Sequence, residues 1–247
     1  METEQNNPLL VSVGCLFLSL SATLIWGGYV IMPRPHLFIV ATMAAFFYCL
    51  GQMLAAGWWF AIPPLKQEFA WVLFSTVTIQ EGIRWAMFAL FNWMKGYGEG
   101  VKAFLRVGAV NGLLTGFAVG AGYGLMSVLL SYTSIVGDNY WFDQSIYMPN
   151  CPEINFFVAG AAFALAYSIM HMALGVLAWS MYDTKNYVGI FFTYAWHLGI
   201  SMASIGNTNR GGCVYTLGIV YGLVVLLSLC ALAFSIRFVK MSKQVDA

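Results

Sequence analysis

The chain has 247 residues, of which 60% are hydrophobic and only 9% are charged. An average soluble domain carries about 25% charged residues, so this chain cannot cover a globular surface with solvated groups. The mean hydropathy of +0.76 agrees, and the net charge of +1 offers no attraction to a polyanion. Composition therefore excludes a soluble domain, a disordered chain and a nucleic-acid binder.

Seven apolar stretches are long enough to cross a bilayer as helices, which takes about 20 residues. Glycine-rich or proline-rich breaks separate them, as at Gly211-Gly212. We therefore expect an all-α polytopic membrane protein in which residues 1–247 form a single seven-helix membrane domain. The predicted spans lie at about residues 9–32, 36–61, 69–94, 104–131, 154–182, 187–206 and 213–239.

Basic residues are distributed unevenly between the two sides of these spans. Cytoplasmic segments of membrane proteins carry an excess of lysine and arginine. With the N-terminus outside, only Lys66 and Arg210 fall on the outside. The sequence therefore predicts a lumenal or extracellular N-terminus and a cytosolic C-terminus. The basic residues on the inside are then Arg34, Lys95, Lys102, Arg106, Lys185, Arg237, Lys240 and Lys243.

Two cysteines fall on the outside in this orientation. Cys151 lies in the longest connection, about residues 134–153, and Cys213 lies at the start of the seventh span. Disulfides form and persist on the oxidising side of a membrane. The two cysteines could be bonded to each other or could remain two separate thiols, and the sequence leaves both interpretations open.

The third span carries polar residues at bilayer depth, where such groups are costly and usually face protein. Glu81 and Gln80 precede Arg84 by three and four residues, so all three share one helix face. His171 in the fifth span and His197 in the sixth lie roughly 15–18 Å from the inside ends, and Arg84 lies at about the same depth. We expect one buried polar cluster. The acid and the arginine form either a neutralised pair that fixes helix packing or a substrate or proton site.

Glycines recur at every fourth position of the fourth span, at Gly112, Gly116 and Gly120. This tandem GxxxG pattern forms a groove on one helix face, which lets another backbone approach closely. It predicts tight packing against a helix of this chain or of another chain.

No catalytic or metal-binding motif accompanies the polar cluster. No aspartate lies deep in a span, and the HExxH zinc motif is absent. Gly199-Ile-Ser201 matches a serine intramembrane protease only faintly, because the candidate histidines precede it. Two histidines and one acid without close spacing fall short of a metal site. We expect no catalytic residue, no metal and no cofactor.

Together these features resemble the anterior-pharynx-defective (Aph) family, which supplies the scaffold subunit of γ-secretase. The resemblance covers about residues 9–240. Trp196 replaces a small residue, and the inside loop from Lys95 to Lys102 and the C-terminal tail are short, which indicates a divergent member. The motifs that carry the resemblance are Gln80-Glu81-x-x-Arg84, the ladder of Gly112, Gly116 and Gly120, His171-x-x-x-Gly175-Val176 and Trp196-His197-Leu198.

The resemblance implies a non-catalytic subunit that holds the complex together with presenilin, nicastrin and the small presenilin-enhancer subunit. The protein would support proteolytic processing of type I membrane proteins such as Notch, in the endoplasmic reticulum, Golgi, endosome or plasma membrane. The catalytic aspartates would belong to presenilin.

The resemblance also implies roles for the two groups of residues. The glycine ladder would support helix packing during assembly. His171 and His197 would line an interior pocket that engages the C-terminal end of presenilin, with Gln80, Glu81 and Arg84 in the same cluster.

The residues also fit a function of another class, a small transporter of protons, ions or a solute. Glu81, Arg84, His171 and His197 would then form a relay, since buried ionisable groups mark such pathways. Transporters usually contain internal repeats, and this sequence shows no clear repeat. The scaffold is therefore favoured, and the missing motifs disfavour an intramembrane hydrolase.

Overall fold

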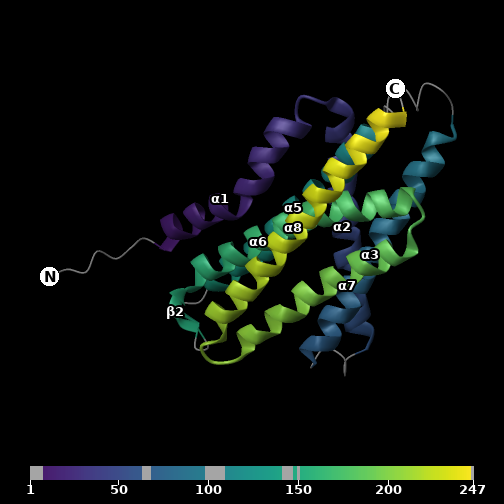
Figure 1. The fold of residues 1–247 in the computed structure, drawn as a ribbon. Helices are drawn as coiled ribbons and strands as arrows, with labels where there is room; N and C mark the ends of the chain where they lie inside the picture. The colour runs from purple at the N-terminus through teal and green to yellow at the C-terminus, as the bar shows by residue number, and fades with distance from the viewer. Residues whose placement is uncertain (1–7, 63–67, 98–108, 141–146, 149–150, 246–247) are drawn as a thin grey trace.

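The computed structural model describes residues 8–62, 68–97, 109–140, 147–148 and 151–245, and most of them are helical (Figure 1). A π-helical turn, Gly27–Ile31, continues α1, and a 3-10 helix, Ser204–Thr208, continues α7. The long helices are α1 (Pro8–Trp26), α2 (Pro35–Ala61), α3 (Phe69–Lys95), α5 (Ala109–Tyr140), α6 (Phe156–Asp183), α7 (Tyr187–Ala203) and α8 (Gly212–Val245).

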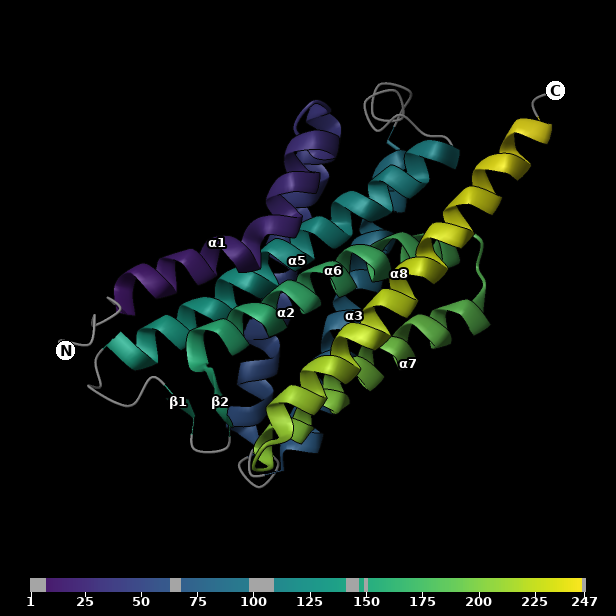
Figure 2. The ribbon, with the colours of Figure 1, turned by 60° about the vertical axis from the view of Figure 1, so that its left-hand side comes forward.

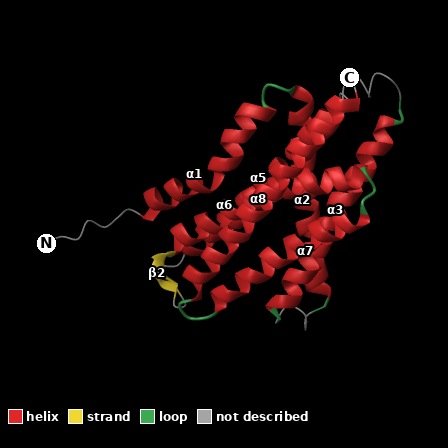
Figure 3. Cartoon of the chain, in the orientation of Figure 1, coloured by secondary structure: helices red, strands yellow, loops and turns green. Residues whose placement is uncertain are grey.

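The helices follow the predicted spans with three differences, one of which is that α8 continues to Val245, beyond the predicted end near residue 239. Helix α5 continues to Tyr140, although the sequence predicted an end near residue 131 and a connection from residue 134. A small antiparallel hairpin, β1 (Tyr147–Met148) and β2 (Cys151–Asn155), precedes α6 (Figure 3). The prediction of an all-α chain missed this hairpin, because strands this short leave no hydrophobic alternation to read.

Six helical segments of the described chain are long and apolar enough to cross a membrane. Helix α3 is not among them, because Gln80, Glu81 and Arg84 lower its apolar character. The structure therefore supports several membrane-spanning helices, and the seventh span stays a prediction.

Helices α5 and α6 form the centre of the bundle. Their candidate spans are 67% and 72% buried, against 22% for those that include α1, α7 and α8. Helix α6 contacts α1, α5, α7 and α8, while α2 packs between α5 and α3 (Figure 2). Helix α3 in turn packs on α7, and the polar residues of α3 contact histidines on α6 and α7.

Candidate functional site

The polar face of α3 is buried within the helix bundle. Arg84 is 0% exposed and Glu81 is 7% exposed. The two are one helical turn apart, and Arg84 Nη1 forms an ion pair with Glu81 Oε1. A buried charge is tolerated only when it is paired and hydrogen-bonded, so each residue makes the other acceptable here.

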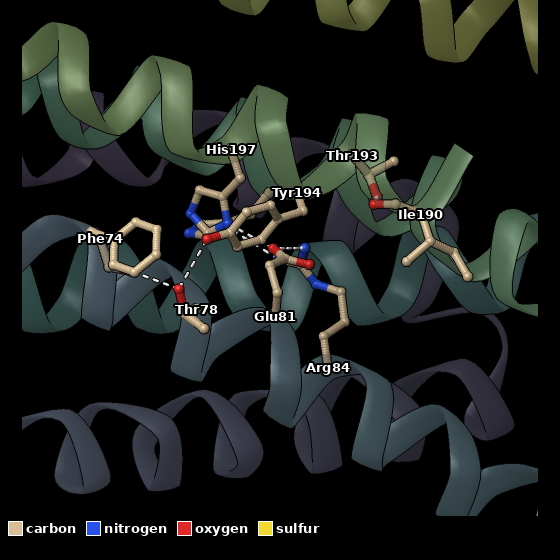
Figure 4. Close-up of polar contacts among 9 residues, drawn as sticks. Phe74, Thr78, Glu81, Arg84, Ile190, Thr193, Tyr194 and His197 are labelled. Carbon is tan, nitrogen blue, oxygen red and sulfur yellow. Dashed lines mark hydrogen bonds and ion pairs between the residues drawn. The ribbon is translucent and has the colours of Figure 1, made fainter. Parts of the chain in front are cut away.

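Two histidines extend this pair to the neighbouring helices. His197 Nδ1 of α7 lies 2.6 Å from Glu81 Oε1, and Arg84 Nη2 lies 3.2 Å from His171 Nδ1 of α6. The two imidazole rings meet edge to face with their centroids 5.2 Å apart. The structure therefore joins α3, α6 and α7 through one chain of polar contacts, part of which Figure 4 shows.

The partners determine where the protons of this cluster reside. A guanidinium only donates, so His171 Nδ1 accepts from Arg84 and the ring proton lies on Nε2. An ionised carboxylate only accepts, so His197 donates to Glu81 through Nδ1. The two histidines therefore have opposite tautomers, and the cluster is neutral overall when both rings are uncharged.

Two tyrosines complete the walls of the cluster. The guanidinium carbon of Arg84 lies 4.7 Å from the ring centre of Tyr123 on α5, which is cation–π geometry. Tyr48 on α2 meets Tyr123 and His171 at centroid distances of 5.3 and 5.5 Å. The sequence does not single out either tyrosine, because nothing in their spacing separates them from the other aromatic residues of α2 and α5.

Several buried donors around the cluster remain unpaired. Arg84 Nε, Tyr123 OH and Ser168 Oγ have no hydrogen-bond partner among the described residues. A buried donor without a partner costs free energy that an acceptor would recover. The cluster can therefore bind a carbonyl or carboxylate group chemically, as well as hold the helices together.

Gln80 lies beside the cluster and is joined to it through a side-chain hydrogen bond with Tyr48, which lines the cluster. Its side chain is buried, at 5% exposure, on the same face of α3 as Arg84. No hydrogen bond between described residues joins it to Glu81, Arg84 or either histidine. Gln80 also lies near Gly51 of α2, so it takes part in the contact between α2 and α3 as well.

Glycines bring α5 and α6 into backbone contact. A Cβ atom at Gly116 would lie 2.8 Å from both the carbonyl oxygen of Gly175 and Cβ of Trp179. A Cβ atom at Gly120 would lie 2.6 Å from Cα of Met172. Real Cβ atoms do not approach other atoms this closely, so only glycine fits at these two positions.

The third member of the predicted ladder lies outside this contact. A Cβ atom at Gly112 would meet nothing within 4 Å, whereas one at Gly124 would lie 2.9 Å from the carbonyl oxygen of Ser168. The close approach to α6 therefore runs from Gly116 through Gly120 to Gly124. A role of these glycines in assembly with other proteins stays a prediction.

A cavity of about 170 Å³ opens between α7 and α8, away from the cluster. Its walls are apolar, and neither His171 nor His197 lines it. Among the described residues, no group of three histidine, cysteine, aspartate or glutamate side chains could hold a metal ion. The lining residues are Phe192, Ala195, Trp196, Gly199, Ile200 and Leu223.

The outer cysteines lie near the hairpin. Cys213 is 3% exposed and disulfide-bonded, and β2, which begins at Cys151, contacts α8. Cys15, Cys49 and Cys230 are free. The side chain of Cys151 lies outside the described residues, so its pairing with Cys213 stays a prediction.

Replacing Cys151 with serine is expected to expose a new thiol at Cys213, because the bonded sulfur loses its partner. Maleimide labelling of the denatured protein before reduction measures this change. Replacing the free Cys230 with serine is the matched control and should expose no new thiol. If Cys213 stays unlabelled in the Cys151→Ser protein, the predicted pairing is wrong.

Comparison with known proteins gives one consistent result. The sequence profile of the family described as Aph-1 protein matches residues 10–237. The Drosophila melanogaster protein named gamma-secretase subunit Aph-1 is 26% identical over 223 residues, which cover 90% of this chain and 91% of that one. The Arabidopsis thaliana gamma-secretase subunit APH1-like is 23% identical over 216 residues (85% and 86%), and the Homo sapiens subunit APH-1B is 23% identical over 212 residues (81% and 80%).

Proposed function

Because the chain belongs to the Aph-1 family, we propose that it is the non-catalytic scaffold subunit of a γ-secretase complex. The observation that carries this proposal is the match along nearly the whole length of relatives named as subunits of that complex. The protein binds presenilin, nicastrin and the small presenilin-enhancer subunit. It thereby supports the cleavage of type I membrane proteins such as Notch, while presenilin supplies the catalytic aspartates.

The proposal includes one seven-helix membrane domain with an outside N-terminus and a cytosolic C-terminus. The basic residues Arg34, Lys95 and Lys185 lie in or beside helix ends that this orientation assigns to the cytosol. The same complex would reside in the endoplasmic reticulum, Golgi, endosome or plasma membrane.

The polar cluster is the proposed contact for presenilin. A chain end carries a carboxylate and free carbonyl groups, which need donors at bilayer depth. The unpaired donors at Arg84, Tyr123 and Ser168 match that need, and they surround His171 and its neighbour His197. The Gly116 and Gly120 contact supports this role by fixing α5 against α6, the two helices that carry Tyr123, Ser168 and His171.

Affinity purification from native membranes in a mild detergent, followed by mass spectrometry, tests the scaffold proposal. Presenilin and nicastrin should co-purify, because a scaffold binds both. Replacing His171 with leucine should reduce presenilin more than nicastrin, since it removes a donor from the presenilin contact. Thr42→Val, on the exposed side of α2, is the control and should leave both unchanged. Recovery of neither partner with the unmodified chain would contradict the proposal.

A transporter remains the alternative that the buried Glu81, Arg84 and histidines favour. Purified protein in liposomes would then move protons or a solute without other subunits, and Glu81→Gln would abolish the flux. An inactive preparation in liposomes counts against this alternative and leaves the scaffold proposal intact.

A further inference from the structure

The hydroxyl group of Tyr48 meets three polar side chains inside the bundle. Gln52 Nε2, one turn further along α2, donates to it at 3.0 Å. Gln80 of α3 and Ser127 of α5 are its other hydrogen-bond partners. Tyr48 is 4% exposed, and Gln80 and Ser127 are each 5% exposed. One buried hydroxyl therefore joins α2, α3 and α5.

This hydroxyl has no hydrogen-bonding capacity left for a ligand. A phenolic hydroxyl has one hydrogen and two lone pairs, so it makes at most three hydrogen bonds. The amide of Gln52 uses one lone pair. The hydrogen and the second lone pair go to Gln80 and Ser127, one of which accepts while the other donates. Tyr48 therefore differs from Tyr123, whose buried hydroxyl has no partner among the described residues.

The partners of the Tyr48 hydroxyl on α3 and α5 each lie one helical turn from a residue of the polar cluster. Gln80 precedes Arg84 by four residues on α3. Ser127 follows Tyr123 by four residues on α5. Arg84 and Tyr123 carry two of the unpaired donors, and the guanidinium lies over the tyrosine ring. The Tyr48 hydroxyl therefore holds α3 and α5 together at the turn next to these donors.

The ring of Tyr48 acts on a third helix, α6. It meets the ring of His171 edge to face, with the two planes 78° apart. Tyr123 and His197 border the same imidazole, at centroid distances of 6.0 and 5.2 Å. The three rings restrict the rotation of the imidazole and keep its Nδ1 atom facing Arg84. The Tyr48 ring therefore helps to orient His171.

We propose that Tyr48 is a positioning residue of the presenilin contact. Its hydroxyl positions the donors of Arg84 and Tyr123, and its ring positions His171. It makes no hydrogen bond to the bound chain, because its own hydroxyl is fully used. The inference rests on the proposed function, since it assigns a role at the contact for presenilin.

Replacing Tyr48 with phenylalanine in the full-length chain tests this role, because the change removes the hydroxyl and keeps the ring. The chain is purified from native membranes in a mild detergent, and the recovery of presenilin is measured relative to that of nicastrin. We expect this ratio to fall about three- to tenfold, the effect of losing one or two hydrogen bonds between membrane helices.

Tyr132→Phe is the matched control. Tyr132 is also fully buried, and its hydroxyl also joins two helices, by donating to the carbonyl oxygen of Ser12 on α1 at 2.9 Å. It lies nine residues beyond Tyr123 on α5, or about 14 Å along the axis. The two variants therefore lose the same group from the interior, but the control should leave the ratio of presenilin to nicastrin unchanged.

The imidazole nitrogens provide a readout that a loss of stability alone would not change. The chain contains three histidines, so protein made with ¹⁵N-labelled histidine gives three sets of imidazole signals. In the unmodified protein, Nδ1 of His171 accepts from Arg84 and the ring hydrogen lies on Nε2. Tyr48→Phe should weaken this bond and move the Nδ1 shift toward that of an unbonded nitrogen. Tyr132→Phe should leave the shift unchanged.

Ser127→Ala is a milder second variant, which decides the matter if the Tyr48→Phe protein does not fold. It removes one of the three partners of the Tyr48 hydroxyl and should lower the ratio about two- to threefold. An unchanged ratio, an unchanged Nδ1 shift of His171, or an equal loss in Tyr132→Phe would overturn the positioning role and leave the scaffold function intact. If neither partner co-purifies with the unmodified chain, the scaffold function is wrong and the positioning role falls with it.

Discussion

Replacing Gly120 with valine is expected to separate α5 from α6 and to remove most of the folded protein. The first atom of any side chain at this position would lie 2.6 Å from Cα of Met172. That neighbour is backbone and cannot rotate away, unlike the end of a flexible side chain. Overpacking a well-packed core costs about 1–3 kcal/mol, and a clash with backbone belongs at the upper end of that range.

The measurement is the melting temperature and yield of the detergent-purified protein, together with the recovery of its partners. Gly112→Val on the same helix is the matched control, since a Cβ atom there meets nothing within 4 Å. Both changes place a β-branched residue in α5, so they share any effect of helix propensity. Equal behaviour of the two variants would contradict the inference that backbone contact between α5 and α6 holds the bundle.

Replacing Arg84 with leucine is the second change expected to have a large effect. It leaves Glu81 buried as a carboxylate without an opposite charge, with His197 as its remaining hydrogen-bond partner. Removing one partner of a buried ion pair costs about 3–5 kcal/mol. The replacement also takes away the donor to His171 and the cation above the ring of Tyr123. We expect loss of the folded protein, measured as the fraction that elutes as a single species in detergent.

A double variant distinguishes an unpaired charge from lost packing. Glu81→Gln together with Arg84→Leu removes both charges, and replacing a whole buried pair by neutral groups is often tolerated. The double variant should therefore be more stable than Arg84→Leu alone. If the second substitution lowers stability further, the cost comes from the shape of the site and not from the carboxylate.

Apolar length and the breaks between apolar runs were enough to predict where most helices lie. Helix α3 runs from Phe69 to Lys95, against a predicted 69–94. Helices α5 and α8 are the exceptions, because their last residues, up to Tyr140 and Val245, are more polar. Hydropathy reports where a membrane would end, whereas a helix ends where its backbone hydrogen bonds end, and sequence marks that point only through caps and breakers.

The site was predictable where it depends on positions along one helix. Glu81 and Arg84 meet because residues three apart share a face. The rotation of α6 and α7 about their axes decides which histidine meets which partner. As a result, His171 bonds to Arg84 and His197 bonds to Glu81. A helix that is apolar on nearly every side, as α6 is, gives no sequence signal for that rotation.

The way in which α5 crosses α6 explains which glycines of the predicted ladder contact α6. The spacing identifies a small face on α5, but crossing helices approach closely over a limited length only. The contact with α6 therefore includes Gly124, and it leaves Gly112 open at the other end. Gly122 lies on another face, toward Ala41 of α2, so the glycines of α5 serve two neighbours.

The order in which the chain is synthesised determines which partners the charged residues of α3 meet first. His171 and His197 follow their partners Arg84 and Glu81 by 87 and 116 residues. At about 5–20 residues per second, the ribosome delivers them about 4–23 s after α3 reaches the translocon. During that interval, Glu81 and Arg84 are already synthesised and can pair with each other. The ion pair within α3 therefore acts first, during insertion, and the histidines complete the cluster once the second half of the chain arrives.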